Sequence, residues 1–123
     1  MILPTKKSPA TKKSPSKLVI YSSPKAGKTT LLSQLDNCLI IDLENGTDFV
    51  EALKIKANSL PELYTIGKEI MKAGKPYKYI AIDTISALED FCEKDALDMY
   101  KKSPIGKSYT GDSVLTLPSG SGY

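Results

Sequence analysis

The chain of 123 residues, with 41% hydrophobic side chains, has the size and composition of one soluble globular domain or of part of one. It contains no apolar run long enough to cross a membrane or to form the core of a secretory signal, so we expect no membrane partner. All 17 basic residues are lysine and histidine is absent, which excludes an arginine finger, a histidine base and a histidine metal site from this segment.

Residues 1–17 are predicted to form a disordered basic tail, and residues 18–123 the folded domain. Lysine, serine, threonine and proline dominate the tail, which carries five lysines and no acidic residue. The remaining body is slightly acidic, so the net charge of +3 resides in the tail. One interpretation is an arm that finds nucleic acid by charge, and the other is a solvated leader with no specific task.

The apolar residues 18–21 predict a strand, and a loop with Gly-Lys-Thr leads from it into a helix from Lys28 to about Asp36. This layout is typical of a phosphate-binding P-loop. Gly27 lets the backbone approach a phosphate, Lys28 is placed to reach the β- and γ-phosphates, and the Thr29 hydroxyl is placed to hold Mg²⁺. The residues expected to contact the nucleotide are Ser22, Ser23, Pro24, Lys25, Ala26, Gly27, Lys28, Thr29 and Thr30.

The loop departs from the usual motif at its first position, where Ser22 replaces glycine. Serine has a Cβ and cannot take every backbone angle open to glycine. Lys25 does not directly follow the first position, which argues against the variant loop of partition-type ATPases. The alternative is an ordinary strand-to-helix turn that happens to contain Gly-Lys-Thr.

Three further elements follow the loop. The continuous apolar run at residues 38–42 predicts a strand that is covered on both faces of a parallel sheet. A short helical stretch is expected from Asp48 through Leu53. A longer helix should begin after Ser59, with Pro61 in its first turn and Glu62 completing a capping box, and should stop at Gly74 and Pro76. The alternation of strands and helices predicts an α/β P-loop sandwich of three layers with a mostly parallel sheet and right-handed crossovers.

The last predicted strand, residues 77–82, ends at Asp83, and a helix is expected from about Ser86 until Ser103 and Pro104 stop it. Cys38 in the second strand and Cys92 on this helix are too far apart in sequence to suggest a disulfide scaffold or a zinc site, and we expect both to be buried thiols in a reducing cytoplasm.

Two carboxylates are placed at strand ends, where ligands bind in open parallel sheets. Asp83 can orient water on the Mg²⁺ that Thr29 holds, and its alternative role is to cap the next helix. Glu44 can polarise the water that attacks the γ-phosphate. The alternative interpretation is that Glu44 is a loop acid that faces solvent and has no role in catalysis. We expect Lys28 and Glu44 to be the catalytic residues, and Thr29 and Asp83 to be the metal-binding ones.

These segments carry a resemblance to known families. Residues 40–44, Ile-Ile-Asp-Leu-Glu, look like the segment that bears the catalytic glutamate in RecA-like recombination ATPases. Residues 82–88, Ile-Asp-Thr-Ile-Ser-Ala-Leu, resemble the Walker B strand of those proteins and the helix after it. The pattern is similar to phage-encoded AAA-type, RecA-like nucleotide-binding proteins, and Glu-Asn-Gly at 44–46 and the Gly-Ser-rich residues 117–123 fit that group. The resemblance covers about residues 18–123.

The resemblance implies an ATPase that uses ATP and Mg²⁺ when full length, coupled to DNA recombination or single-strand annealing. Single-stranded DNA and further copies of the chain are the implied partners, in the cytoplasm of a bacterial or phage-infected host cell. The neighbouring subunit in such assemblies often supplies a cation. Here that cation must be a lysine or come from outside this segment.

The resemblance also implies that the chain is the N-terminal part of a RecA-like core. A further strand with a polar sensor residue should follow the Gly-rich segment and lie between the P-loop strand and the Walker B strand. Without it, unpaired backbone groups in an apolar setting cost about 1–3 kcal/mol each. We therefore expect the 123 residues alone to be marginally stable and weakly active.

Alternative functions remain open. A nucleotide-gated DNA-binding module would keep the pocket without significant hydrolysis. A small-molecule P-loop kinase usually closes arginine-bearing lids over the phosphates, and this segment has no arginine. A GTPase is disfavoured because no Asn-Lys-x-Asp segment is present.

Overall fold

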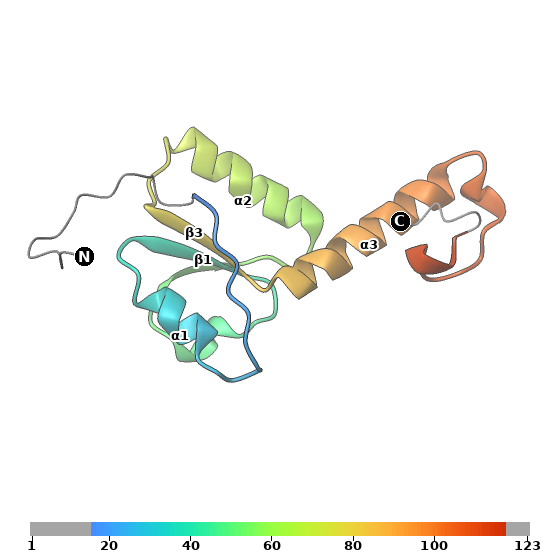
Figure 1. Cartoon of the computed structure of the whole chain (residues 1–123). Helices are drawn as coiled ribbons and strands as arrows, with labels where there is room; N and C mark the ends of the chain where they lie inside the picture. Colours follow the sequence, from blue (N-terminus) through green and yellow to red (C-terminus); the bar gives the residue numbers. More distant parts are fainter. Residues whose placement is uncertain (1–15, 118–123) are drawn as a thin grey trace, which may run out of the picture.

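The computed structural model describes residues 16–117, and it confirms the α/β class with a wholly parallel sheet (Figure 1). Most of the predicted tail and the Gly-Ser-rich residues 118–123 lie outside the described residues. The helices and strands are α1 (Lys28–Ser33), β1 (Cys38–Asp42), β2 (Leu53–Lys56), α2 (Leu60–Lys72), β3 (Tyr79–Asp83) and α3 (Ile85–Lys102). Three short 3-10 turns complete the chain: η1 (Thr47–Phe49), η2 (Gly106–Ser108) and η3 (Val114–Thr116).

The sheet has the strand order β2-β1-β3, and both pairings are parallel. Every residue of β1 is buried, as its continuous apolar run predicts for a central strand. The register pairs Ile41 with Ile55 on one side and with Ile82 on the other, and it pairs Asp42 with Asp83. Since the three strands run in the same direction, their carboxyl ends meet at one edge of the sheet.

Helices lie on both faces of the sheet: α2 covers one and α1 lies against the other (Figure 1). Leu63, Ile66 and Ile70 of α2 pack on the buried side chains of Leu39 and Ile41. Each such apolar side chain contributes about 1.5–3 kcal/mol when fully buried. This contact fixes α2 on its face of the sheet and leaves the opposite face to α1.

The start of α2 agrees with the predicted cap. The Ser59 hydroxyl accepts a hydrogen bond from the Glu62 backbone N–H at 3.4 Å. The Glu62 carboxylate turns back, but it accepts from the N–H of Asn58 at 2.8 Å instead of from that of Ser59. The Ser59 bond is therefore the one that the motif predicts, whereas the return bond of Glu62 is made one residue earlier.

Helix α3 begins directly after β3 and extends beyond the sheet (Figure 1). Its first turns pack on the core through Ala87, Leu88 and Phe91. Its far half is covered by the residues after it, where Val114 is buried and the Tyr109 ring meets the Tyr100 ring edge-on at 5.8 Å. The helix ends at Lys102, in agreement with the predicted stop.

The predicted strand at residues 18–21 is wrong. These residues form no regular structure, and Leu18 and Val19 are 79% and 78% exposed. A strand requires a neighbour that accepts and donates its backbone hydrogen bonds, and within residues 16–117 none lies beside this segment. The helix that follows is also shorter than expected, because α1 ends at Ser33.

The predicted helical stretch from Asp48 through Leu53 is also largely wrong. Only the three-residue turn η1 is helical, and Leu53 begins strand β2. The alternation in Leu-Lys-Ile-Lys is the period-two signal of a half-buried strand. Cys92 is exposed and not buried, because α3 leaves the sheet soon after Phe91, whereas Cys38 is buried as expected.

Candidate nucleotide-binding site

The loop before α1 is held open by left-handed backbone at two residues, Lys25 and Gly27. Gly27 has φ of +90° and is the N-cap of α1, and its carbonyl accepts the Leu31 N–H at 2.9 Å. A residue with a Cβ would be strained by about 1–2 kcal/mol in this left-handed conformation, so the turn requires glycine at this position. The first backbone amides of a helix have no partner within the helix, so those at the start of α1 are available to an anion.

The Lys28 ammonium lies across its own loop. It donates to the Ser22 carbonyl, the Ser22 hydroxyl and the Ser23 carbonyl, each at 3.3 Å. The serine that replaces the usual glycine therefore adds an oxygen ligand for the lysine. The positive charge of Lys28 therefore lies in the loop that the sequence predicts to bind the phosphates.

The P-loop contacts the end of β3 through one short hydrogen bond. The Thr29 hydroxyl donates to Asp83 Oδ2 at 2.6 Å, across 54 positions of sequence. Asp83 is buried, and it is the last residue of β3. A hydroxyl and a carboxylate oxygen are the hard ligands that Mg²⁺ prefers, and Mg²⁺ commonly takes only one or two protein ligands together with phosphates and waters.

Glu44 lies at the same edge of the sheet. Beyond the paired residues Asp42 and Asp83, one further backbone hydrogen bond joins β1 and β3, from the Leu43 N–H to the Asp83 carbonyl at 2.7 Å. Beyond it, Glu44 Oε1 accepts a hydrogen bond from the Thr84 hydroxyl at 2.6 Å. The structure thus joins Thr29 to Asp83 and Glu44 to Thr84, the residue after Asp83, with Lys28 at the start of α1.

A family model described as an AAA domain matches residues 14–114. The chain belongs to this family. The AAA-type family consists of P-loop ATPases, which bind a nucleotide and usually use Mg²⁺. No curated protein and no solved structure matches the chain. Within residues 16–117, no helix of this AAA domain is long and apolar enough to cross a membrane.

The AAA domain also contains a buried carboxylate whose role the sequence does not reveal. Asp42 is 1% exposed and accepts four hydrogen bonds. The donors are the backbone N–H groups of Glu44, Gly46 and Thr47 and the Thr47 hydroxyl. Burial alone would raise the pKa of Asp42, but these donors outweigh burial and hold that pKa below its ordinary value.

The bonds to Asp42 fix the turn that carries Glu44. Three of the four donors are backbone amides of that turn. The sequence signal for this arrangement is an aspartate at a strand end followed by Leu-Glu-Asn-Gly-Thr, because aspartate side chains commonly bond backbone amides a few residues ahead. Asp42 therefore shapes the edge of the candidate site without facing it.

The other residues expected to contact nucleotide lie on the surface of the loop. Thr30, on the first turn of α1, is exposed, and the structure shows no side-chain contact from it to Asp83 or Glu44 among residues 16–117. The remaining members, Ser23, Pro24, Lys25 and Ala26, are all exposed. Their arrangement fits main-chain contacts to a phosphate better than side-chain contacts.

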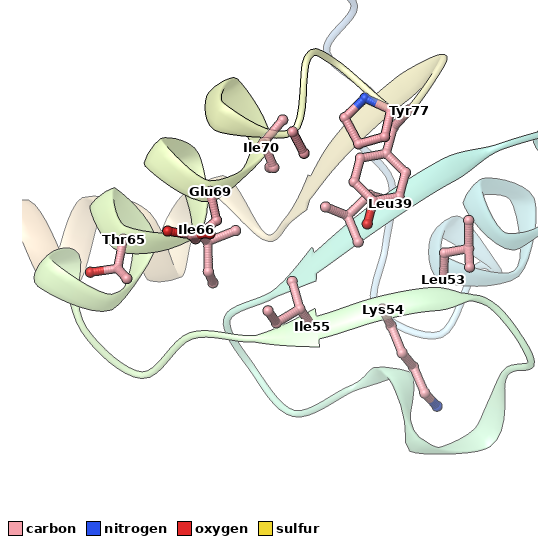
Figure 2. A pocket seen from close by; sticks show the side chains of 11 residues that line it. Leu39, Leu53, Lys54, Ile55, Thr65, Ile66, Glu69, Ile70 and Tyr77 are labelled. Atoms are coloured by element: carbon pink, nitrogen blue, oxygen red, sulfur yellow. The ribbon is translucent and has the colours of Figure 1, made fainter.

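A separate hollow of about 550 Å³ lies between α2 and the sheet (Figure 2). Leu39, Ile55, Ile66 and Ile70 face one another in it, while Lys54 points away from it (Figure 2). Its lining is mainly apolar and includes no residue of the P-loop and neither strand-end carboxylate. The lysine, hydroxyl and carboxylate groups that the sequence predicts for a nucleotide site lie beside the start of α1 and at the end of β3, and not in this hollow.

Among residues 16–117, no three His, Cys, Asp or Glu side chains come together as a metal cage. A Mg²⁺ ion at Thr29 and Asp83 would therefore take most of its ligands from phosphate oxygens and water, as Mg²⁺ does in nucleotide sites. The residues present fit such an ion. They do not fit a metal bound by protein ligands alone.

Proposed function

We propose that this AAA domain binds ATP with Mg²⁺ and hydrolyses it, and that hydrolysis drives a DNA transaction such as recombination or single-strand annealing. The observation that carries the proposal is the 2.6 Å bond between the Thr29 hydroxyl and Asp83, with Glu44 at the same edge of the sheet. In this arrangement the P-loop, a metal-binding carboxylate and a candidate base belong to one site.

Each residue then has a defined task. Bound Mg²⁺ supplies positive charge at the β- and γ-phosphate oxygens. Thr29 and Asp83 hold that ion, and the Lys28 ammonium exchanges its three loop oxygens for phosphate oxygens. The Glu44 carboxylate orients the attacking water and takes its proton, which is the role of a general base.

The proposed partners are single-stranded DNA and further copies of the chain. Five lysines in the first seventeen residues support contact with the phosphates of single-stranded DNA. RecA-like sites often lie between subunits, and the only basic residues of this segment are lysines, so we propose that a neighbouring copy supplies a further cation to the γ-phosphate. Salt-dependent DNA binding and ATP-dependent assembly are the expected consequences.

The function is tested by phosphate release from Mg²⁺-ATP. Glu44→Gln keeps the size of the side chain and removes the base, so we expect release to fall about 100-fold while nucleotide binding is retained. Glu51→Gln is the matched control, because Glu51 is an exposed acid outside the site, and it should leave the rate unchanged.

Equal rates for Glu44→Gln and the wild type would remove Glu44 from the mechanism. Nucleotide binding with phosphate release at background level in every variant would contradict the hydrolase and favour a nucleotide-gated DNA-binding module. Measuring affinity for single-stranded DNA with and without ATP distinguishes that module from an inactive protein.

A further inference from the structure

Thr84 is the N-cap residue of α3, but its hydroxyl does not cap that helix. Threonine is favoured at this position because its side chain can accept a hydrogen bond from an amide of the first turn, which contributes about 1 kcal/mol. Here the hydroxyl instead donates to Glu44 Oε1 at 2.6 Å, across 40 positions of sequence. The side chain of Thr84 is therefore committed to Glu44 and not to its own helix.

The sheet register makes this contact reproducible. Asp42 and Asp83 are partners at the ends of β1 and β3, and the bond from the Leu43 N–H to the Asp83 carbonyl continues the ladder. Thr84 is the next residue after Asp83, and it is half-buried. Its backbone position is set by the end of the β1–β3 ladder, whereas Glu44 is an exposed side chain on a turn.

One hydrogen bond thus restricts a side chain that would otherwise sample several rotamers. Ordering a glutamate side chain costs up to about 2 kcal/mol of conformational entropy. Among residues 16–117, Oε1 of Glu44 is held by Thr84, and Oε2 accepts no hydrogen bond from a protein side chain. The carboxylate is therefore anchored by one oxygen and presents the other.

We propose that Thr84 is a positioning residue for Glu44, which orients the carboxylate so that its free oxygen receives the proton of the attacking water. The inference rests on the proposed function, because it assigns Glu44 the role of base. Thr84 itself touches neither nucleotide nor metal in this scheme. Its effect should therefore appear in the catalytic rate and not in affinity for ATP.

The test compares Thr84→Val and Thr84→Ser in the full chain, by steady-state phosphate release and by binding of a fluorescent ATP analogue. Valine keeps the shape of threonine and removes the hydroxyl, so kcat should fall about tenfold with KM unchanged. Serine restores the donor and should return kcat to about the wild-type value. Thr65→Val is the matched control, since that hydroxyl bonds only the Pro61 carbonyl within α2, and it should leave kcat unchanged.

A second comparison ties the effect to Glu44. In the Glu44→Gln background, Thr84→Val should cause no further loss of rate, because the group that Thr84 positions is already disabled. An equal loss in both backgrounds overturns the inference, as does a Thr84→Val enzyme that is as fast as the wild type or faster. Failure of Thr84→Ser to recover the rate also overturns it.

The failure of this inference can be distinguished from failure of the proposed function. If Glu44→Gln is slow and Thr84→Val matches the wild type, only the role of Thr84 is overturned. If Glu44→Gln matches the wild type, or the wild type itself releases no phosphate, both are overturned.

Discussion

The buried carboxylate of Asp42 should be a main determinant of the stability of the turn before η1. The change to test is Asp42→Asn, which keeps the shape of the side chain and removes one acceptor oxygen. Oδ1 accepts from the amides of Glu44 and Gly46, and Oδ2 accepts from the amide and hydroxyl of Thr47. In the better orientation of the asparagine, its NH₂ group replaces Oδ2.

The magnitude follows from the bonds that are lost. The Thr47 hydroxyl can rotate to accept from the new NH₂ group, but the Thr47 backbone N–H keeps no acceptor, at a cost of about 1–3 kcal/mol. The two bonds to Oδ1 lose their charge, and each weakens by about 1 kcal/mol. Relief of the desolvation of a buried charge offsets part of this, which leaves a loss of about 2–4 kcal/mol in the free energy of unfolding.

Urea denaturation followed by circular dichroism measures that loss. Asp48→Asn is the matched control, because Asp48 lies on the same segment and forms only a surface ion pair with Lys56 at 2.9 Å. Surface pairs contribute about 0–1 kcal/mol, so the control should unfold near the wild-type midpoint. Equal midpoints for Asp42→Asn and Asp48→Asn would refute the structural role of the Asp42 hydrogen bonds.

Three further predictions follow from burial and charge. The folded-state pKa of Asp42 lies below its ordinary value of 3.8. The contribution of its carboxylate to stability is therefore complete above pH 3.8 and is lost as pH falls through the lower folded-state pKa. Wild-type stability should drop more steeply in acid than that of Asp42→Asn. Burial raises the pKa of the Cys38 thiol, whereas Cys92 is exposed. Iodoacetamide should therefore modify Cys92 in the native protein and Cys38 only after unfolding. Rapid labelling of both thiols would contradict the packing of β1. Tyr79 and Ile80 on β3 are 44% and 52% exposed, so the 123-residue chain should be marginally stable and should melt below body temperature; a cooperative melt well above that temperature would be the contrary result.

Helices α2 and α3 and the central strand could be predicted because their signals are local. Ser59 and Glu62 mark the start of α2, and the apolar run of β1 predicts its burial on both faces. Residues 18–21 show the limit of such signals, because an apolar run does not reveal whether a neighbouring strand exists to pair with it. Strand β2 was detectable in principle from its alternation of apolar and charged residues.

The members of the candidate site follow from sequence motifs and stay predictions, whereas its contacts could not be predicted. A P-loop and two strand-end acids are visible as motifs, and the parallel sheet places the acids at one edge. The bond from Thr84 to Glu44 depends on the register of β1 and β3, which no local pattern specifies. The role of Asp42 depends on the direction of three backbone amides, which is set only when the turn has folded.

The central claim is that Lys28, Thr29 and Asp83 form one site for a Mg²⁺-bound triphosphate, and nucleotide binding tests it most directly. Affinity for a fluorescent ATP analogue should be measured with Mg²⁺ and with EDTA for the wild type, Lys28→Ala, Asp83→Asn and the exposed control Lys68→Ala. The account predicts loss of binding in Lys28→Ala, loss of the Mg²⁺-dependent part in Asp83→Asn, and wild-type affinity in Lys68→Ala. Unchanged affinity and Mg²⁺ dependence in the first two variants would show that the nucleotide binds elsewhere or not at all.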